Sequence, residues 1–194
     1  SSNSKKNSLK HFNNYIDSLM TIGKDRAKYP DQINKSFGVT IDTIHGSKGK
    51  EYPIYTRKFM SLDSKEEIML DVNEMAKDYE YYQVSGLSVS PDNKKISFGV
   101  DTLSRRIYTI NVKDLETGKM LSDEIKGVNS YTAWSSDSKT FFYTGKDKET
   151  LRSDKIFRHN IGDDQGDDEI VYEEKDETFS TYVYPSKSRE YIFI

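Results

Sequence analysis

The feature that most constrains the fold of this chain is an internal repeat in its second half. The segment 90–98 (SPDNKKISF) lines up with 135–143 (SSDSKTFFY), and each copy has the pattern of a strand, a tight turn and a second strand. A third copy begins at 182–188 (YVYPSKS). The period of about 45–50 residues falls among propeller arrays, in which four short strands form one blade. The sequence therefore predicts the end of one blade, two whole blades and the start of another.

Alternation of apolar and polar residues after Glu51 predicts a mainly β fold, because a period of two is typical of half-buried strands. Polar turns separate the alternating segments at short intervals. The predicted strands are 54–59, 67–71, 86–90, 95–100, 106–112, 140–144, 155–161, 169–172 and 191–194. The predicted core residues of the blades are Phe98, Trp134, Tyr143, Phe157 and Tyr184.

A different pattern marks the N-terminal part. Four apolar residues at three- or four-residue spacing predict an amphipathic helix, with Ser8 as its N-cap and Gly23 as its C-terminal stop. They are Leu9, Phe12, Ile16 and Leu19. Residues 38–44 predict a short strand rich in β-branched side chains. We therefore predict a helix plus short strand over 1–50, and over 51–194 an incomplete β-propeller with about three blades' worth of four-stranded antiparallel sheets.

Composition and charge exclude several classes of protein. The chain has no cysteine, which excludes disulfides and thiolate sites. A net charge of -3, with both signs mixed throughout, argues against a general nucleic-acid binder, which carries a basic excess. No apolar run approaches the length of a membrane span, and the N-terminus lacks the apolar core of a signal peptide. We therefore expect a cytoplasmic protein without a membrane partner.

No catalytic or nucleotide-binding motif is complete. A serine nucleophile of the Gly-x-Ser-x-Gly type needs a sharp turn after a strand. The nearest match, 86–90, lacks the second glycine and lies in a predicted strand. A phosphate-binding loop ends in Gly-Lys followed by Ser or Thr, and neither residue follows the Gly-Lys pairs at 23–24, 49–50, 118–119 and 145–146. We predict no catalytic residue and no cofactor.

Acidic residues and histidines do not form a metal motif. The acidic run at 163–169 lacks the alternating ligands and distal Glu of a calcium-binding loop, so we predict a solvated loop between blade strands. The three histidines, His11, His45 and His159, lie far apart and without cysteine partners, which makes a zinc site unexpected. His159 falls within a predicted strand, where we expect a structural role. We predict no metal site.

Several short runs, in order along the chain, carry a resemblance to a known family. The runs are Glu51-Tyr52-Pro53-Ile54-Tyr55, Leu70-Asp71-Val72-Asn73, Ser90-Pro91-Asp92-Asn93, Leu103-Ser104-Arg105-Arg106, Leu115-Glu116-Thr117-Gly118 and Tyr172-Glu173-Glu174-Lys175-Asp176. Together they make the segment 51–194 resemble the N-terminal propeller of oligopeptidase B, in the prolyl oligopeptidase family.

This resemblance implies a non-catalytic role. In that family a C-terminal α/β-hydrolase domain performs the chemistry, and the propeller covers the active site and restricts substrates to short peptides, which are cleaved after Lys or Arg. The implied partners are therefore that catalytic domain and short basic peptides. Because the 194 residues contain none of the catalytic domain, we expect the chain to be inactive alone.

Two neighbouring arginines, Arg105 and Arg106, are the site residues that the resemblance singles out. In the family, propeller residues of this region face the catalytic domain and form interdomain ion pairs near the substrate. The resemblance implies that Arg106, and with it Arg105, contributes to that interface and to substrate gating. The alternative is a surface hairpin with two solvated arginines. Charged contacts hold a domain interface only when both partners are present, and the partner domain is not part of these 194 residues.

A second resemblance concerns 38–51, which is similar to motif V of the UvrD/Rep-type superfamily 1 helicases, Thr-x-His-x-x-Lys-Gly-x-Glu after a strand. It implies that Thr43 and His45 are relics of a single-stranded DNA contact, and that Gly49 and Glu51 are relics of a nucleotide contact. Lys50 departs from the motif, which has an apolar residue there. Without a phosphate-binding loop the motif cannot serve an ATPase. We therefore expect it to be an inert relic and do not expect nucleic-acid partners.

The two resemblances meet at 49–53 (GKEYP), and from this we infer a chimera joined at a short shared sequence. Two alternatives to the propeller role follow. One is a stand-alone propeller-type interaction module, which needs a closed ring. The other is an inert helicase–peptidase chimera.

Overall fold

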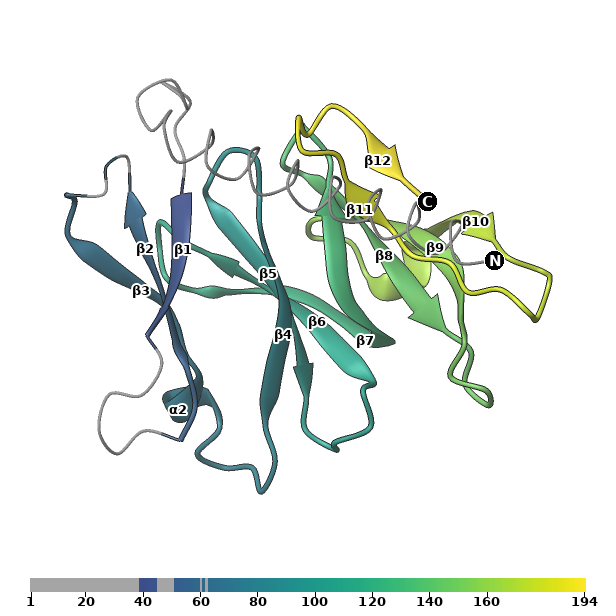
Figure 1. Cartoon of the computed structure of the whole chain (residues 1–194), viewed down its shortest axis with the longest axis horizontal. Coiled ribbons are helices and arrows are strands. Elements are labelled where there is room, and N and C mark those ends of the chain that lie inside the picture. The colour runs from purple at the N-terminus through teal and green to yellow at the C-terminus, as the bar shows by residue number, and fades with distance from the viewer. Residues whose placement is uncertain (1–38, 45–50, 60, 62) are drawn as a thin grey trace, which may run out of the picture. The chain divides into compact units, whose positions relative to one another are not determined.

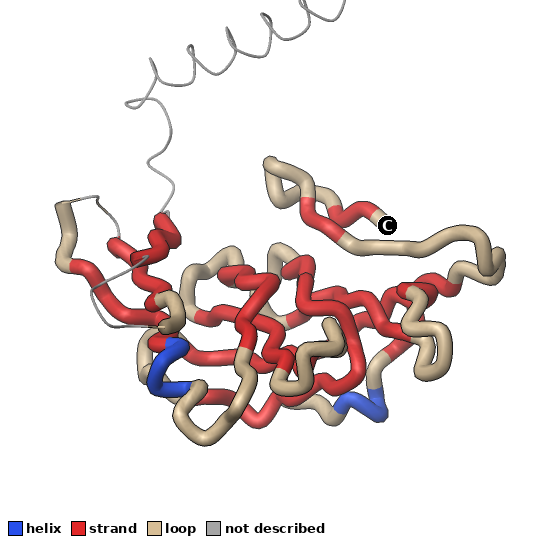
Figure 2. Tube along the Cα trace, turned by 60° about the horizontal axis from the view of Figure 1, so that its bottom comes forward, coloured by secondary structure: helices blue, strands red, loops and turns tan. Residues whose placement is uncertain are grey.

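A computed structural model of the chain describes residues 39–44, 51–59, 61 and 63–194. The predicted N-terminal helix and two residues of the helicase-like run, His45 and Gly49, lie outside these residues. The described part is mainly β, with antiparallel sheets, and its helical segments are the short α2 (Val72–Met75) and η1 (Gln165–Asp167) (Figure 2). The predicted fold class is confirmed at this level.

The first sheet has three strands in the order β1 (Val39–Ile44), β2 (Ile54–Phe59) and β3 (Glu66–Asp71). α2 follows β3 directly, because the Asp71 carboxylate accepts a hydrogen bond from the backbone N–H of Asn73 at 3.0 Å and so caps the helix. We name β1–β3 and α2 the first unit. The sequence did not predict α2, which spans only one turn.

The second sheet has seven strands, β4 (Gln83–Val89), β5 (Lys95–Asp101), β6 (Tyr108–Asp114), β7 (Met120–Trp134), β8 (Thr140–Lys146), β9 (Ser153–Asn160) and β10 (Glu169–Glu173) (Figure 1). The first part of β7, up to Val128, pairs with β6, and the part from Val128 pairs with β8. β7 therefore closes one four-stranded group and opens the next. We name β4–β6 with the first part of β7 the second unit, and the rest of β7 with β8–β10 the third unit.

β7 was not predicted, although it is the longest strand among the described residues. Its pairing shifts register three times, so its apolar residues do not keep a period of two. A last pair of short strands, β11 (Tyr184–Pro185) and β12 (Ile192–Phe193), forms a two-stranded sheet, which we name the fourth unit.

The internal repeat reappears as three equivalent turns. In each turn the first residue, Ser90, Ser135 or Ser186, donates its N–H to the carbonyl five residues later, at 2.8–2.9 Å. The fourth residue of each turn has a positive φ, and these residues are Asn93 (62°), Ser138 (57°) and Arg189 (61°). Because the left-handed region is unfavourable for most side chains, its recurrence at one position is a signature of a common turn. The predicted repeat is therefore confirmed in the turns.

Alternation along β5 fixes which unit each side chain contacts. Ile96 and Phe98 are fully buried against Met69 and Leu70 of β3. The alternate residues of β5 point the other way, toward the second part of β7. There the Ser97 hydroxyl lies 2.6 Å from the Thr132 hydroxyl. We name the contacts of β3 and α2 with β5 and β6 the first interface, and those between the second and third units the second interface.

The second interface contains the largest buried cluster. Ile110, Ile125 and Val128 from the second unit meet Phe141 and Tyr143 from the third. Trp134 joins them, and its indole N–H donates to the Ser88 carbonyl and the Ser97 hydroxyl, both at 3.1 Å. Three of the predicted core residues, Phe98, Trp134 and Tyr143, are buried, and Phe157 is partly buried. Tyr184 is wrong as a core residue, because 58% of it is exposed at the short fourth unit.

Candidate functional site

The loop between β5 and β6, residues 102–107, carries the predicted arginine pair. Asp101 is buried, and its carboxylate accepts hydrogen bonds from the N–H groups of Leu103 at 2.8 Å and Arg106 at 2.7 Å. Ser104 and Arg106 adopt positive φ angles of 57° and 56°. Such conformations persist only where neighbouring bonds enforce them. The Asp101 carboxylate therefore fixes the backbone from which both arginines project.

Both guanidinium groups are exposed, and within the described residues neither forms an ion pair with a carboxylate. Lys146, at the end of β8, donates a hydrogen bond from its ammonium group to the Arg106 carbonyl. Burial lowers the pKa of Lys146, and the nearby charge of Arg106 lowers it further. Three cationic side chains, Arg105, Arg106 and Lys146, thus lie at the same end of the second sheet. We name them the cationic loop cluster.

The cationic loop cluster can bind anions but supplies no nucleophile. Guanidinium groups hold carboxylates through paired, charge-assisted hydrogen bonds. A fixed backbone with solvated arginines fits both sequence interpretations, an interdomain contact and a surface hairpin.

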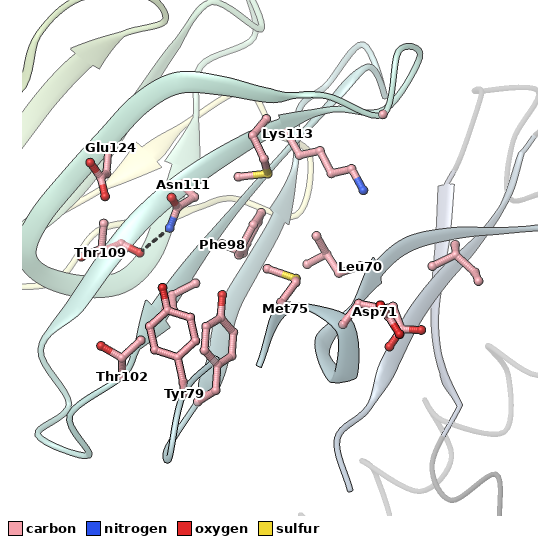
Figure 3. A pocket seen from close by; sticks show the side chains of 16 residues that line it. Leu70, Asp71, Met75, Tyr79, Phe98, Thr102, Thr109, Asn111, Lys113 and Glu124 are labelled. Atoms are coloured by element: carbon pink, nitrogen blue, oxygen red, sulfur yellow. Dashed lines mark hydrogen bonds between the residues drawn. The ribbon is translucent and has the colours of Figure 1, made fainter. Parts of the chain in front are cut away.

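A cavity of about 650 Å³ is the second candidate, and it lies along the first interface (Figure 3). Its apolar wall includes Leu70, Met75 and Phe98. Lys113 lines it from β6 and donates a hydrogen bond to the Met69 carbonyl at 2.6 Å. Burial lowers the pKa of Lys113 because the charged ammonium group loses water there. The lysine therefore ties β6 to β3 across one end of the cavity.

The carboxylates around this cavity are already engaged. Asp71 caps α2, and Glu74 forms an exposed ion pair with Lys77. Glu124 also lines the cavity, and it forms an exposed ion pair with Lys126, two residues further along β7. The cavity has the character of an apolar groove between two sheets, without an arrangement for acid–base chemistry.

The remaining predicted positions do not converge on these candidates. Thr43 lies in β1 and pairs with Tyr55, and Glu51 is exposed before β2. Ser88 lies within β4, and its carbonyl accepts hydrogen bonds from Ser97 and Trp134. It is thus part of the second interface.

Sequence reasoning missed a buried charged cluster at the second interface. Asp168, placed by the sequence in a solvated acidic loop, has a side chain that is only 2% exposed. That prediction is wrong for Asp168, because its carboxylate binds His159 and Tyr143. The other partner of His159 is Asp123, which lies in the unpredicted strand β7. No sequence signal pointed to Asp123, since the alternation of β7 is broken.

The described residues contain neither a membrane-spanning helix nor a metal-binding group. Neither described helix has the length or apolar character needed to cross a membrane. The described segments also hold no group of three or more His, Cys, Asp or Glu residues arranged to bind a metal ion.

The chain is similar to known proteins over most of its length. The model of the N-terminal beta-propeller domain of prolyl oligopeptidase matches residues 22–194. Dipeptidyl aminopeptidase BI of Pseudoxanthomonas mexicana is 35% identical over an alignment of 161 residues, and the match covers 75% of this chain and 22% of that protein. Protease 2 of Moraxella lacunata is 36% identical over an alignment of 154 residues, and the match covers 76% of this chain and 22% of that protein.

Solved structures agree with the family match. Oligopeptidase B from Leishmania major is 29% identical and covers 81% of this chain and 24% of its own, with a TM-score of 0.71. The chain thus spans less than a quarter of the length of these relatives. The family match also runs across 38–51, and none of these comparisons supports the helicase resemblance at Thr43, His45, Gly49 and Glu51.

Proposed function

Because the chain belongs to the prolyl oligopeptidase family, whose N-terminal β-propeller it matches, we propose that it acts as the non-catalytic gating part of an oligopeptidase B-like serine peptidase. In that role the propeller restricts access to short peptides and contacts a C-terminal α/β-hydrolase domain. The substrates proposed are short peptides cleaved after Lys or Arg. The chain alone should not hydrolyse them.

The observation that supports an interdomain contact is the cationic loop cluster. Its backbone is held by the buried Asp101 carboxylate, yet Arg105 and Arg106 have no carboxylate partner within the described part of the chain. Guanidinium groups that project from a fixed backbone are suited to meet carboxylates of another domain. We therefore propose that this end of the second sheet faces the catalytic domain.

The division of the chain into 1–50 and 51–194 is a related proposal that rests on the sequence. β1 lies before residue 50 and pairs with β2, so the first sheet takes one strand from each part. Deleting 1–50, which removes β1, should leave 51–194 folded, as measured by circular dichroism. Loss of the β signal in that deletion would contradict the division.

Peptide hydrolysis tests the gating role. The purified chain is mixed with a separately made hydrolase domain of a relative, and cleavage of a fluorogenic dibasic peptide is measured. We expect no hydrolysis by the chain alone and an increased rate in the mixture. Hydrolysis by the chain alone would overturn the proposal, because it would require a nucleophile within these 194 residues.

A graft tests the role of the arginines. Residues 51–194 replace the matching segment of Protease 2, and the double variant R105A/R106A is compared with K119A. Lys119 is an exposed cation in the β6–β7 turn, which lies at the opposite end of the strands. We expect the double variant to lower kcat/KM for dibasic peptides about tenfold, from the loss of charged contacts worth about 1.5 kcal/mol. An equal effect of K119A, or none from the pair, would favour the solvated hairpin.

A further inference from the structure

The buried histidine of the second interface lies between two carboxylates. His159 Nε2 is 3.0 Å from Asp123 Oδ1, and its Nδ1 is 2.7 Å from Asp168 Oδ1. The side chains of all three residues are at most 2% exposed. Asp123 belongs to the first part of β7 and hence to the second unit, whereas His159 and Asp168 belong to the third. The imidazole ring therefore joins two successive units.

The protonation state of the ring follows from which groups can donate. A neutral imidazole donates through one nitrogen and accepts through the other, and an ionised carboxylate only accepts. With a neutral ring, one of the two short contacts would place two acceptors against each other. With both carboxylates ionised, only an imidazolium donates to both of them.

No other neighbour supplies the missing proton. The Asp123 carboxylate already accepts from the Gly162 N–H at 2.6 Å, and the Asp168 carboxylate accepts from the Tyr143 hydroxyl at 2.7 Å. The second oxygen of Asp123 is buried and has no hydrogen-bond partner within the described residues. The negative charge of Asp123 consequently depends on His159 for its compensation.

We propose that Asp123, His159 and Asp168 form a buried proton-binding site, in which a doubly protonated His159 holds the second and third units together. This inference is independent of the proposed peptidase role. Removing the proton leaves two carboxylates facing each other across a neutral ring away from water. Buried charge without compensation is costly, so cohesion of the second interface is linked to proton uptake.

The groups around the site agree with this assignment. β7 contributes Asp123, β8 contributes Tyr143, and the segment after η1 contributes Asp168. The ring of Phe141, also on β8, lies 5.0 Å from the imidazole and carries no charge. The neighbouring Arg158 pairs with Glu169 on the exposed side of β9. Within the described residues, no second cation is bonded to the two buried carboxylates.

The electrostatic directions are those expected of an imidazolium between two anions. Burial by itself would lower the pKa of His159, but the hydrogen bonds and charges of Asp123 and Asp168 outweigh it and raise the pKa above 6.5. Burial would likewise raise the pKa of Asp123, and the bonds from His159 and the Gly162 N–H lower it instead. The two shifts describe one ion pair from its two ends.

Nuclear magnetic resonance of the histidine rings tests the proposal directly, because the chain has only three histidines. The ring ¹⁵N shifts of the whole chain are followed from about pH 5 to pH 9, a range that brackets the ordinary histidine pKa. The variant H159Q identifies the His159 signals by their disappearance. We expect both His159 nitrogens to show imidazolium shifts at about pH 7, where an unperturbed histidine is mostly neutral.

A conservative variant keeps the test valid if H159Q does not fold. D123N retains the shape of the carboxylate but removes its charge, and should move the His159 midpoint to lower pH. D164N, which removes the charge of an exposed carboxylate in the loop that carries Asp168, is the matched control and should move it less. A neutral His159 ring at pH 6.5, or a midpoint unchanged in D123N, would overturn the proposal.

Discussion

The two interfaces between successive units are built on equivalent strands but are filled differently. Register makes Asn111 of β6 equivalent to Phe157 of β9, because they pair with Phe98 and Tyr143 respectively. At the second interface Tyr143 and Phe157 stack, with ring centroids 5.2 Å apart and planes 9° apart. At the first interface Asn111 lines the cavity of about 650 Å³. One aromatic ring in place of an amide thus distinguishes a filled interface from a hollow one.

The polar tie across each interface differs in the same way. Lys113 and His159 occupy equivalent positions, paired with Ile96 and Phe141. Among the described residues, Lys113 bonds to a neutral carbonyl of β3, whereas His159 bonds to two carboxylates. The repeat therefore conserves the place of a polar contact between units but not its chemistry. The second interface combines aromatic burial with charge, and we expect it to be the stronger of the two.

The largest expected effect is that of W134A at the second interface. Trp134 is 5% exposed, and the change removes a buried ring and leaves the Ser97 hydroxyl and Ser88 carbonyl without its N–H. We expect the free energy of unfolding to fall by about 3–5 kcal/mol. Urea unfolding followed by circular dichroism measures it, since the chain has no other tryptophan to report by fluorescence.

A matched truncation at the first interface sets the scale. L70A removes a fully buried side chain that lines the cavity. Because one side of Leu70 faces this cavity, the substitution loses fewer packing contacts than W134A does. We expect a loss near the lower end of about 2–5 kcal/mol. A loss larger than that of W134A would reverse the ranking of the two interfaces.

The next effect concerns close approach of the backbones at the second interface. A Cβ at Gly99 would lie 2.6 Å from the Ser130 Cβ and 2.7 Å from its Cα. G99A should therefore cost about 1–3 kcal/mol by overpacking. Gly166 has no atom within 4 Å of such a Cβ, so G166A is the control and should change stability by less than about 0.5 kcal/mol. Equal costs for the two variants would mean that the second interface can open by several tenths of an ångström.

Sequence reasoning predicted the repeat because its turns recur with the same residue types. Ser90 and Ser135 open equivalent turns, and the alternation of β5 and β8 survives in both copies. β7 escaped prediction because it serves two units: its pairing partner changes near Val128, and its register shifts break the period of two. A strand whose two parts face different neighbours cannot show one alternation.

The site was predictable only where a local sequence determines it. The arginine loop follows from adjacent residues and the neighbouring Asp101, and the predicted pair does lie on it. The cluster of Asp123, His159 and Asp168 depends on strands that folding brings together. No single residue of the cluster therefore predicted a charged site from its local sequence. The acidic run even favoured solvent for Asp168. Asp168 is buried because His159 and Tyr143 donate hydrogen bonds to its carboxylate.

Filling the cavity should make the first interface more like the second. N111F places an aromatic ring where Phe157 lies in the next unit, facing Phe98 and Leu70. We expect a gain of about 0.5–2 kcal/mol in the free energy of unfolding, as for other cavity-filling changes. N111A separates the loss of the amide, which donates to the Thr109 carbonyl, from the gain of the ring. If both variants destabilise the chain equally, the cavity does not accept a ring.

The smallest effect is a difference in pH dependence between the two polar ties. The pKa of His159 is raised, so its contribution is fully present below 6.5 and is lost as the pH rises through the folded-state value. The pKa of Lys113 is lowered by burial, so the folded chain releases that proton before the unfolded chain does. Stability contributed at the first interface therefore rises with pH between the lowered value and 10.5. Unfolding of H159Q and K113M along a pH series separates the two contributions.

Each variant should remove one of the two contributions to the pH dependence of the free energy of unfolding. Relative to H159Q, the unmodified chain should lose stability as the pH increases above 6.5. Relative to K113M, it should gain stability in the alkaline range, by less, because Lys113 is only partly buried and solvent screens its charge. Methionine keeps most of the lysine's apolar stem, so K113M isolates the ammonium group. The same sign for both contributions would mean that equivalent positions carry equivalent chemistry after all, and that the difference between a carbonyl and two carboxylates does not decide how the units are held.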